Sequence, residues 1–447
     1  MSGRTIIIRG HAASLPLPAG SADLIVTSPP YFGLRSYTDG GEHYDGQIGS
    51  EPSPAAYLEA LWACTAEWMR VLKPEGSLFI NLGDKYAGNQ PRTRWHASRP
   101  ERQETVRDNG QSAAASGKFS FREHPDKSLL GLPWRYALGC MDRLGLILRA
   151  EIIWDKPNGL PESVTDRVRR SHEQVFHFTR QPRYYAAVDE IREAHVRSWG
   201  GSPNGGHTYG MMKAPGEKDA NLPVALPNPL GKLPRSVWAI PSAPLTVPPH
   251  LGVDHFAAYP PELVRRIILG WSPPAVCTAC GQGRRPVTKV SYELRQRTNN
   301  AYKWSGDEYA DGTGLSAHNS IIGSAGGRAW RNATITGYAC ACTPHTDHPG
   351  TGERDAGDQY HLDGWTPPPA RPAVVVDPFG GTGTAALVAA AYGRVGVTID
   401  LSHDYCRLAR WRTRDPGERA RAMQVPKPPP VPSGQEALFS TEELSAS

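Results

Sequence analysis

The sequence predicts an α/β fold. The length of 447 residues suggests two or three domains, and one large α/β core with insertions would also fit. Three observations carry the prediction of the fold class. Residues 4–8 and 22–27 are short β-rich runs bounded by Gly, Pro or Asp, a pattern typical of buried strands. Residues 54–72 begin with Pro and repeat apolar side chains at spacings of three and four, which indicates a helix. Residues 373–400 combine a strand, a glycine turn, an Ala-rich helix and a second strand in one compact unit.

The remaining elements follow from the same patterns. The sequence predicts strands at 77–84, 150–156 and 173–180, the last two as a pair joined by a polar loop, and helices at 129–148 and 261–271. The polar stretch 87–128 and the Gly/Pro-rich stretch 197–235 are expected to be long loops.

The composition is consistent with a sizeable core that carries long loops. The chain has 447 residues, of which 39% are hydrophobic, with 46 Gly and 42 Pro. These Gly and Pro residues are too scattered for a collagen-like or wholly disordered chain. The formal net charge of +5 excludes a histone-like polycation. Most basic residues are Arg, which suits contacts to phosphate and guanine, although a GC-rich genome produces the same bias.

No segment predicts export or membrane insertion. The opening residues lack the apolar stretch of a signal peptide, and no run of about 18 apolar residues occurs. We therefore expect a cytoplasmic protein that makes no membrane contact.

The unit at 373–400 has the features of a cofactor site. The strand VVVD is followed by PFGGTGT, whose glycines let the backbone approach a ligand, and by a helix start with unpaired N–H groups. Asp377 ends the first strand and Asp400 the next, a spacing that suits an acid on ribose hydroxyls in a Rossmann-like unit. No Gly-Lys-Ser/Thr follows, so this is not a Walker loop, and GxGxxG is not matched. The alternative is an ordinary strand–helix turn.

A second motif, TSPPY at 27–31, follows the strand at 22–27 directly. Two prolines cannot continue a β-ladder, and they stiffen the backbone where it leaves the sheet. A planar group bearing NH2 could stack on Tyr31 while Ser28 and the Pro29 carbonyl accept its two hydrogens. The alternative is a tight Pro-Pro turn with a packed tyrosine.

Together, TSPPY and DPFGGTGT resemble the DNA amino-methyltransferases, which methylate an exocyclic nitrogen of cytosine or adenine with S-adenosylmethionine. TSPPY precedes DPFGGTGT, an order that resembles the circularly permuted β-group. The chain also resembles the family, in family order, at 70–88, 151–180, 236–241 and 255–269. The resemblance implies a Rossmann-like, S-adenosylmethionine-dependent methyltransferase fold.

The resemblance also implies roles for individual residues. The flipped base would be held by Ser28, Pro29, Pro30 and Tyr31. The cofactor would be bound by Asp377, Phe379, Gly380, Gly383, Asp400, Phe256 and Pro260. One departure is Gly10-His11, where the family often has Gly-Asp, which puts an acidic contact to the cofactor adenine in doubt.

The implied chemistry is direct methyl transfer to a flipped base in double-stranded DNA. Ser rather than Asp before the prolines favours the N4 of cytosine, with the N6 of adenine as the alternative. Two rivals stay open: an RNA or protein amino-methyltransferase, and a non-catalytic DNA-binding protein of this fold. The family implies a bacterial, archaeal or phage origin and a restriction–modification context. Whether a cognate restriction endonuclease accompanies the protein, and its oligomeric state, are open.

Four of the seven cysteines predict a structural zinc site. They are Cys277, Cys280, Cys340 and Cys342, and tetrahedral zinc can be bound by two such closely spaced pairs. Free thiols or a redox pair are the alternatives. Similar cysteine inserts occur in some members of the family. Basic residues between the pairs motivate the hypothesis that this zinc-ribbon-like insertion grips DNA, with a solvated basic surface as the alternative; they are Arg284, Arg285, Lys289, Arg295 and Arg297.

The predicted organisation divides the chain into six segments. They are the catalytic half of the core (1–185), target-recognition loops (186–235), a core helix (236–274), the zinc-binding insertion (275–347), the cofactor-binding half (371–415) and a disordered Pro-rich tail (416–447).

Overall fold

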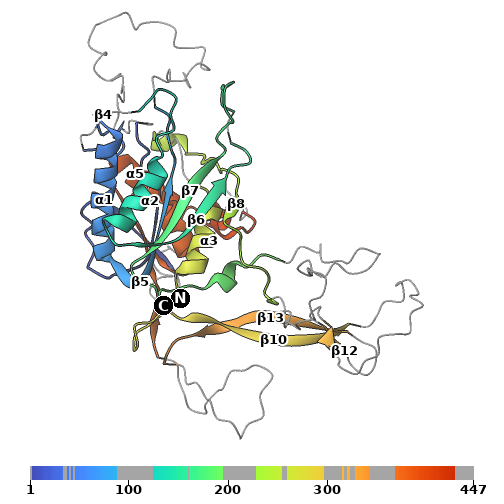
Figure 1. Ribbon diagram of the computed structural model, residues 1–447. Coiled ribbons are helices and arrows are strands. Elements are labelled where there is room, and N and C mark those ends of the chain that lie inside the picture. The colour runs from blue at the N-terminus through green and yellow to red at the C-terminus, as the bar shows by residue number, and fades with distance from the viewer. Residues whose placement is uncertain are drawn as a thin grey trace, which may run out of the picture.

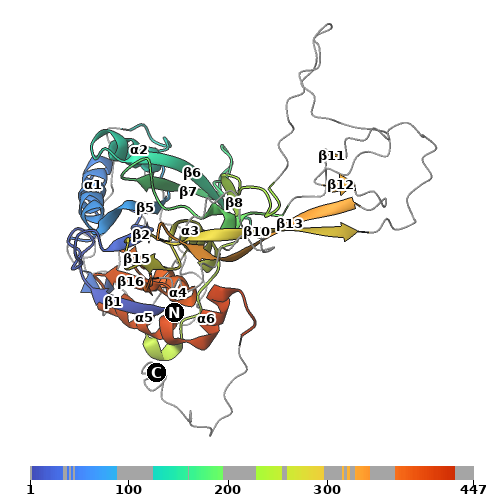
Figure 2. The same ribbon diagram turned by 90° about the horizontal axis from the view of Figure 1, so that it is seen from below.

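An eight-stranded sheet with helices on both faces forms the centre of the protein (Figures 1 and 2). The computed structural model describes residues 3–33, 38–39, 42–43, 46–87, 124–159, 161–194, 228–253, 259–295, 315–316, 320–322, 328–342 and 368–427.

The sheet is parallel except for one strand. In spatial order its strands are β1 (Arg4–Arg9), β16 (Val395–Asp400), β15 (Val374–Asp377), β2 (Ala22–Thr27), β5 (Leu72–Leu82), β7 (His172–Thr179), β6 (Ile147–Asp155) and β8 (Val237–Ala239). Only β7 runs against its two neighbours. The predicted Rossmann-like α/β class is therefore confirmed, with β6 and β7 forming the predicted pair.

Successive side chains of the central strand β2 point to opposite faces of the sheet, and each face is covered by its own layer of the core. Ile25 packs on one face with residues of helices α1 (Pro54–Val71) and α2 (Leu132–Asp142). Leu24 and Val26 pack on the other face with residues of α3 (Pro261–Trp271) and α4 (Thr384–Ala391). Every residue of β2 is buried, as expected for a parallel strand covered on both sides. Helix α5 (His403–Arg414) packs along the edge strand β1.

Two predicted boundaries are wrong. The strand predicted at 77–84 begins earlier, at Leu72, because that side chain is buried and pairs with Ala22. The helix predicted at 129–148 covers only α2, because Gly145 with φ +65° turns the chain into β6.

The described residues also contain two short helices and two short strand pairs. The 3-10 helices are Val188–Ile191 and Pro249–Leu251, and the strand pairs are β3 (Thr38–Asp39) with β4 (Glu42–His43), and β9 (Val276–Cys277) with β14 (Ala370–Arg371). Val188–Ile191 packs on α3, and the Ala187 N–H donates to the Gly270 carbonyl at 2.7 Å. This part of the predicted recognition segment 186–235 thus belongs to the core, whereas 195–227 lies outside the described residues.

The cysteine insertion contains a long antiparallel ribbon that its weak apolar pattern did not predict. Strands β10 (Arg285–Arg295) and β13 (Arg328–Ala339) pair along their length, and β12 (Ser320–Ile322) and β11 (Leu315–Ser316) extend the sheet. The insertion leaves the core after α3 and returns just before β15 begins. It therefore projects from the amino ends of the parallel strands, as Figure 1 shows.

The prediction that the chain is disordered from 416 onwards is wrong for its first part. Helix α6 (Pro416–Met423) begins at Asp415, whose side chain accepts from the Glu418 N–H, and it buries Ala420 and Ala422. Glu418 pairs with Arg412, a guanidinium only 2% exposed, at 2.8 Å. A buried guanidinium needs such a partner, and this pairing attaches α6 to the core. Residues 428–447 lie outside the described residues.

The helices among the described residues include none long and apolar enough to cross a membrane.

Glu418→Ala is expected to lower the free energy of unfolding by about 3 kcal/mol, because it leaves the buried Arg412 without its counterion. Urea denaturation followed by circular dichroism measures this loss. Asp166→Ala is the matched control: it removes an exposed ion pair with Lys127 at 2.7 Å and should change nothing measurable. Equal effects of the two variants would contradict the assigned role of the buried pair.

Candidate functional site

The two sequence motifs meet at the carboxyl ends of neighbouring strands. β2 ends at Thr27 and β15 ends at Asp377, and the two strands are paired in the sheet. The Thr27 hydroxyl donates a 2.6 Å hydrogen bond to Asp377 across this boundary. TSPPY and DPFGGTGT, far apart in the chain, are therefore joined directly beneath the site.

Asp377 is a buried anchor rather than a cleft residue. Its carboxylate also accepts from the Phe379 N–H at 3.1 Å and from the Tyr259 hydroxyl. Burial raises the pKa of Asp377 to about 6, although the hydrogen bonds from Thr27, Tyr259 and the Phe379 N–H oppose this rise. The carboxylate thus orients the start of the glycine loop from below.

The glycines at 380 and 383 are required for close packing. A Cβ on Gly380 would lie 1.6 Å from the Thr398 hydroxyl oxygen on β16. Gly383 has φ +74°, and a Cβ there would lie 3.0 Å from Ala409 of α5. Gly380 and Gly383 therefore let the loop pack closely against β16 and α5. Phe379 and Gly381, in the same loop, line the cleft described below.

The TSPPY turn is held from the helix layer. The Tyr57 hydroxyl of α1 donates to the Pro30 carbonyl at 2.9 Å. Ser28 is partly exposed, while Pro29 is buried. The turn therefore presents the Ser28 hydroxyl at the end of β2, next to backbone that Tyr57 holds at Pro30.

A cleft opens where these motifs meet. It is bordered by the ends of β1, β2 and β16, the glycine loop, and the start of α5; its lining residues are Gly10, His11, Ala12, Ser28, Pro30, Gly46, Gln47, Ile48, Phe379, Gly381, Asp400, Leu401 and Tyr405. The Asp400 carboxylate accepts from the N–H groups of Gly381 (2.8 Å) and Ser402 (2.9 Å), which fixes its orientation.

The cleft brings together only part of the predicted set. Ser28, Pro30, Phe379 and Asp400 line it. Five other predicted residues are described but do not line it: Pro29, Tyr31, Asp377, Gly380 and Gly383. Pro260, at the start of α3, does not line it either. Phe256 lies outside the described residues.

The sequence did not single out several cleft residues. Gln47 and Tyr405 line the cleft, and so does His11, which the sequence marked only as a departure from the family's Gly-Asp. Tyr405 follows the carboxyl end of the parallel strand β16, a position that could have identified it. Gln47 lies in a loop whose sequence carries no comparable signal.

Behind Ser28 lies a polar network that includes Tyr31 of the predicted site residues. The Tyr31 hydroxyl donates to Glu173 Oε2 at 2.7 Å, and the Asn81 side-chain N–H group reaches the same oxygen at 2.7 Å. Lys156 pairs with the other oxygen of Glu173. Tyr31 thus presents its hydroxyl to this network, beside its predicted role as a stacking surface.

Comparison with known proteins identifies the family. Residues 22–278, more than half of the chain, match the family described as DNA methylase (N6_N4_Mtase). The chain is 33% identical to the type II methyltransferase M.Cfr9I of Citrobacter freundii over 61% of this chain and 74% of that protein. It is 34% identical to the type II methyltransferase M.XycI of Xanthomonas campestris pv. cyanopsidis, over 56% and 67% of the two chains.

The chain belongs to the N6/N4 DNA methylase family. The resemblance predicted from TSPPY and DPFGGTGT is confirmed. A solved structure, PvuII DNA methyltransferase (cytosine-N4-specific), aligns with this DNA methylase at 12% identity over 95% of this chain and 92% of that one. Its TM-score of 0.47 is too low to support a choice of target base.

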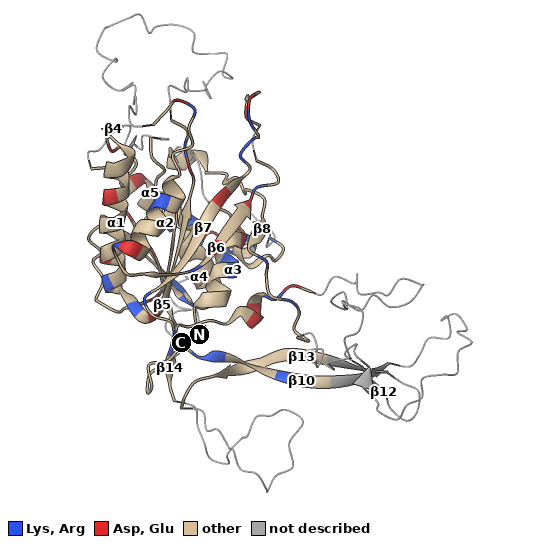
Figure 3. Ribbon diagram, in the orientation of Figure 1, with Lys and Arg blue, Asp and Glu red and all other residues tan. Residues whose placement is uncertain are grey.

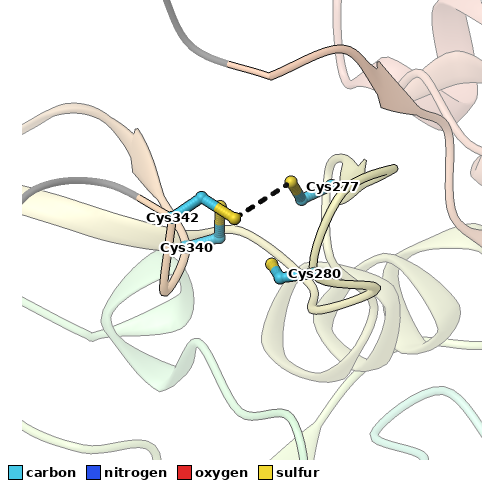
Figure 4. Close-up of side chains that lie close together, drawn as sticks. All are labelled: Cys277, Cys280, Cys340 and Cys342. Carbon is cyan, nitrogen blue, oxygen red and sulfur yellow. Dashed lines mark hydrogen bonds between the residues drawn. The ribbon is translucent and has the colours of Figure 1, made fainter.

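A second candidate site in this DNA methylase lies at the base of the insertion (Figure 4). Cys277 and Cys280 precede β10, and Cys340 and Cys342 follow β13. Their four sulfur atoms lie within 4.8 Å of one another. Cys277 Sγ and Cys342 Sγ are 3.9 Å apart, near the roughly 3.8 Å expected between thiolates bound tetrahedrally at about 2.3 Å from zinc.

The local backbone at the first cysteine pair favours a thiolate. Gly281 has φ +73° and its N–H donates to the Cys277 carbonyl at 3.0 Å, which closes a tight turn around Cys280. Backbone N–H groups of Cys280 and Ala279 lower the pKa of Cys277 to about 6. The donor set and this turn fit a metal ion that prefers sulfur.

The raised pKa of Asp377 predicts a pH dependence of stability. A carboxyl with a folded-state pKa near 6 and an ordinary value of 3.8 stabilises the fold while protonated, and this contribution is lost as pH rises through about 6. We expect the wild-type free energy of unfolding, relative to that of Asp377→Asn, to fall by about 2 kcal/mol between pH 4 and 7. Urea denaturation across this range measures the difference, and parallel pH curves for the two proteins would contradict the assignment.

Proposed function

We propose that this protein transfers the methyl group of S-adenosylmethionine to the exocyclic N4 of cytosine in double-stranded DNA. The observation that carries the proposal is the single cleft shared by Ser28 of TSPPY and by Phe379 and Asp400 of the cofactor unit. N6-adenine is the second candidate, since either base offers a planar amino group.

The cofactor half of the cleft fits S-adenosylmethionine. The Asp400 carboxylate is oriented by two backbone N–H groups and can accept from ribose hydroxyls. Phe379 offers an aromatic surface, and Gly381 leaves the loop without a side chain at the cleft wall. When bound, the cofactor supplies an electrophilic methyl group. His11 supplies no carboxylate at the place where the family often has one.

The base-binding half acts on the amino group of the target. The lone pair of an exocyclic amine is delocalised into the ring, which makes the nitrogen a weak nucleophile. Hydrogen bonds from its N–H groups to Ser28 and to the Pro29 carbonyl would favour the pyramidal nitrogen of the transition state. The base must leave the duplex to reach this turn, at a cost of a few kcal/mol.

Ser28 supports the choice of cytosine, because a Ser rather than an Asp before the two prolines is similar to the motif of the N4-cytosine members of the family. An RNA or protein amino-methyltransferase remains a rival, since the proline turn specifies only a planar NH2 group. The family context also supports double-stranded DNA as partner. A restriction endonuclease encoded alongside this protein is a further part of the proposal.

The position of the insertion bears on the DNA-grip hypothesis. The ribbon lies at the amino ends of the parallel strands, whereas the cleft lies at their carboxyl ends (Figure 3). Strand β10 carries the basic residues Arg285 and Lys289, and the Arg285 guanidinium donates to the core carbonyls of Ala186 at 3.0 Å and Tyr184 at 3.3 Å. The six residues of β2 alone separate the two ends by about 20 Å. A duplex that delivers a base into the cleft would therefore not reach the ribbon base without bending around the core.

Expression in a host that lacks DNA methylation tests the function. Sequencing that separates N4-methylcytosine from N6-methyladenine is expected to find N4-methylcytosine at one recognition sequence, and to find none with Ser28→Ala. N6-methyladenine alone would overturn the choice of base. Labelled methyl transfer to RNA or protein, without transfer to DNA, would overturn the substrate.

We propose further that Cys277, Cys280, Cys340 and Cys342 bind one structural zinc ion, which clamps the two strands of the ribbon at their base. The sulfur distances and the turn at Gly281 support this proposal. The distance from the cleft argues against a catalytic role for the metal.

Metal analysis of the purified protein is expected to find one zinc per chain. Cys280→Ser should release the zinc, and proteolysis should then cut the insertion before the core. Cys140→Ala is the control, because Cys140 is buried in the core away from the cluster and its loss should leave the zinc bound. Retention of zinc by Cys280→Ser together with Cys342→Ser would contradict the site.

A further inference from the structure

Methylation of an exocyclic amine creates a proton that must leave. The nitrogen that forms the new bond to carbon carries a positive charge until one of its N–H bonds breaks. If Ser28 accepts one of these hydrogens, as the proposed function holds, its hydroxyl is the first group that can both receive a proton and pass one on. The Pro29 carbonyl can only accept.

A path of hydroxyl groups leads from Ser28 to a carboxylate. Ser28 Oγ lies 3.3 Å from the Tyr31 hydroxyl oxygen, and the Tyr31 hydroxyl donates to Glu173 Oε2 at 2.7 Å. The Asn81 side-chain N–H group lies within hydrogen-bond distance of all three groups, at 3.3 Å from Ser28 Oγ and 2.8 Å from the Tyr31 hydroxyl. Asn81 is only 5% exposed, so it holds the path in a fixed geometry.

The surroundings suit Glu173 as the end of this path. Lys156 pairs with the second oxygen of Glu173. The side chain of Glu173 is 15% exposed and that of Lys156 is 23% exposed, so a proton that reaches Glu173 can pass on to solvent. The pKa of Tyr31 lies well above its ordinary value, because of burial and then the negative charge of Glu173. Tyr31 therefore stays protonated and can relay a proton without storing a charge.

The neighbouring carboxylates Asp84, Asp377 and Asp400 have other roles. Asp84 accepts from the backbone N–H groups of Gly131 and Leu132 at the start of α2. Asp377 is enclosed beneath the glycine loop, and Asp400 belongs to the cofactor half of the cleft. Glu173, in contrast, is joined to Ser28 through the Tyr31 hydroxyl.

We propose that Glu173 is the terminal acceptor of the proton that the target amine releases, through the hydroxyls of Ser28 and Tyr31. An N–H bond of the amine breaks and its electron pair stays on nitrogen. That proton bonds to Ser28 Oγ, the Ser28 proton moves to the Tyr31 oxygen, and the Tyr31 proton moves to Glu173, which becomes neutral. The inference rests on the proposed function, because it assumes that Ser28 contacts the target amine.

Single-turnover methyl transfer to unmethylated DNA, with labelled S-adenosylmethionine, tests the relay. Glu173→Gln keeps the size and an oxygen that can accept from Tyr31, but it cannot take up the proton. We expect about a 100-fold slower turnover for Glu173→Gln, and a similar loss for Tyr31→Phe, with cofactor affinity unchanged in a direct titration. Because both act on one path, the double variant should be no slower than the worse single variant.

Two further variants separate the relay from a merely structural role. Glu173→Asp keeps the carboxylate and should be faster than Glu173→Gln. Glu162→Gln, which removes an acid of the adjacent loop paired with Arg167 at 2.8 Å, should match wild type. A Glu173→Gln rate within threefold of wild type, or losses that multiply in the double variant, would overturn the relay. A wild-type protein that binds S-adenosylmethionine but methylates no DNA would instead overturn the proposed function.

Discussion

The buried hydrogen bond between Thr27 and Asp377 is the contact on which the site depends. It joins the ends of β2 and β15, which carry the two motifs, and it is only 2.6 Å long in surroundings that exclude water. An unpartnered buried carboxylate would be costly, so Thr27, Tyr259 and the Phe379 N–H together stabilise this arrangement. The same contacts position the glycine loop beside Ser28, which creates the cleft.

Around this contact, each motif is supported from a different layer. Tyr57 of α1 holds the proline turn, and Gly380 lets the cofactor loop lie against β16. The network of Asn81, Glu173 and Lys156 comes from strand ends on the other side of β2. Because β7 runs antiparallel, its first residues lie at the same end of the sheet as the carboxyl ends of the parallel strands, so Glu173 reaches a site that those strands build.

The cysteine insertion is joined to the core at one place, away from the site. It interrupts the chain between α3 and β15 without disturbing either, because both of its ends meet at β9 and β14, away from the cleft. The cysteine cluster lies at this junction, where a bound metal would hold together the two chain segments that enter and leave the ribbon. The family match ends at residue 278, just as the insertion begins.

Local patterns in the sequence determined the fold class, the two motifs, the strand pair β6–β7, helix α3 and the four clustered cysteines, because each depends on spacing within a short segment. Only the tertiary structure decided which residues face the cleft. Asp377 and Gly383 belong to the predicted cofactor loop but do not line the cleft, whereas His11 and Tyr405 do. The Glu173–Tyr31 contact joins residues that no local period relates, and α6 forms because Glu418 meets the buried Arg412. Such pairings arise from strand order and burial, which a single sequence does not display.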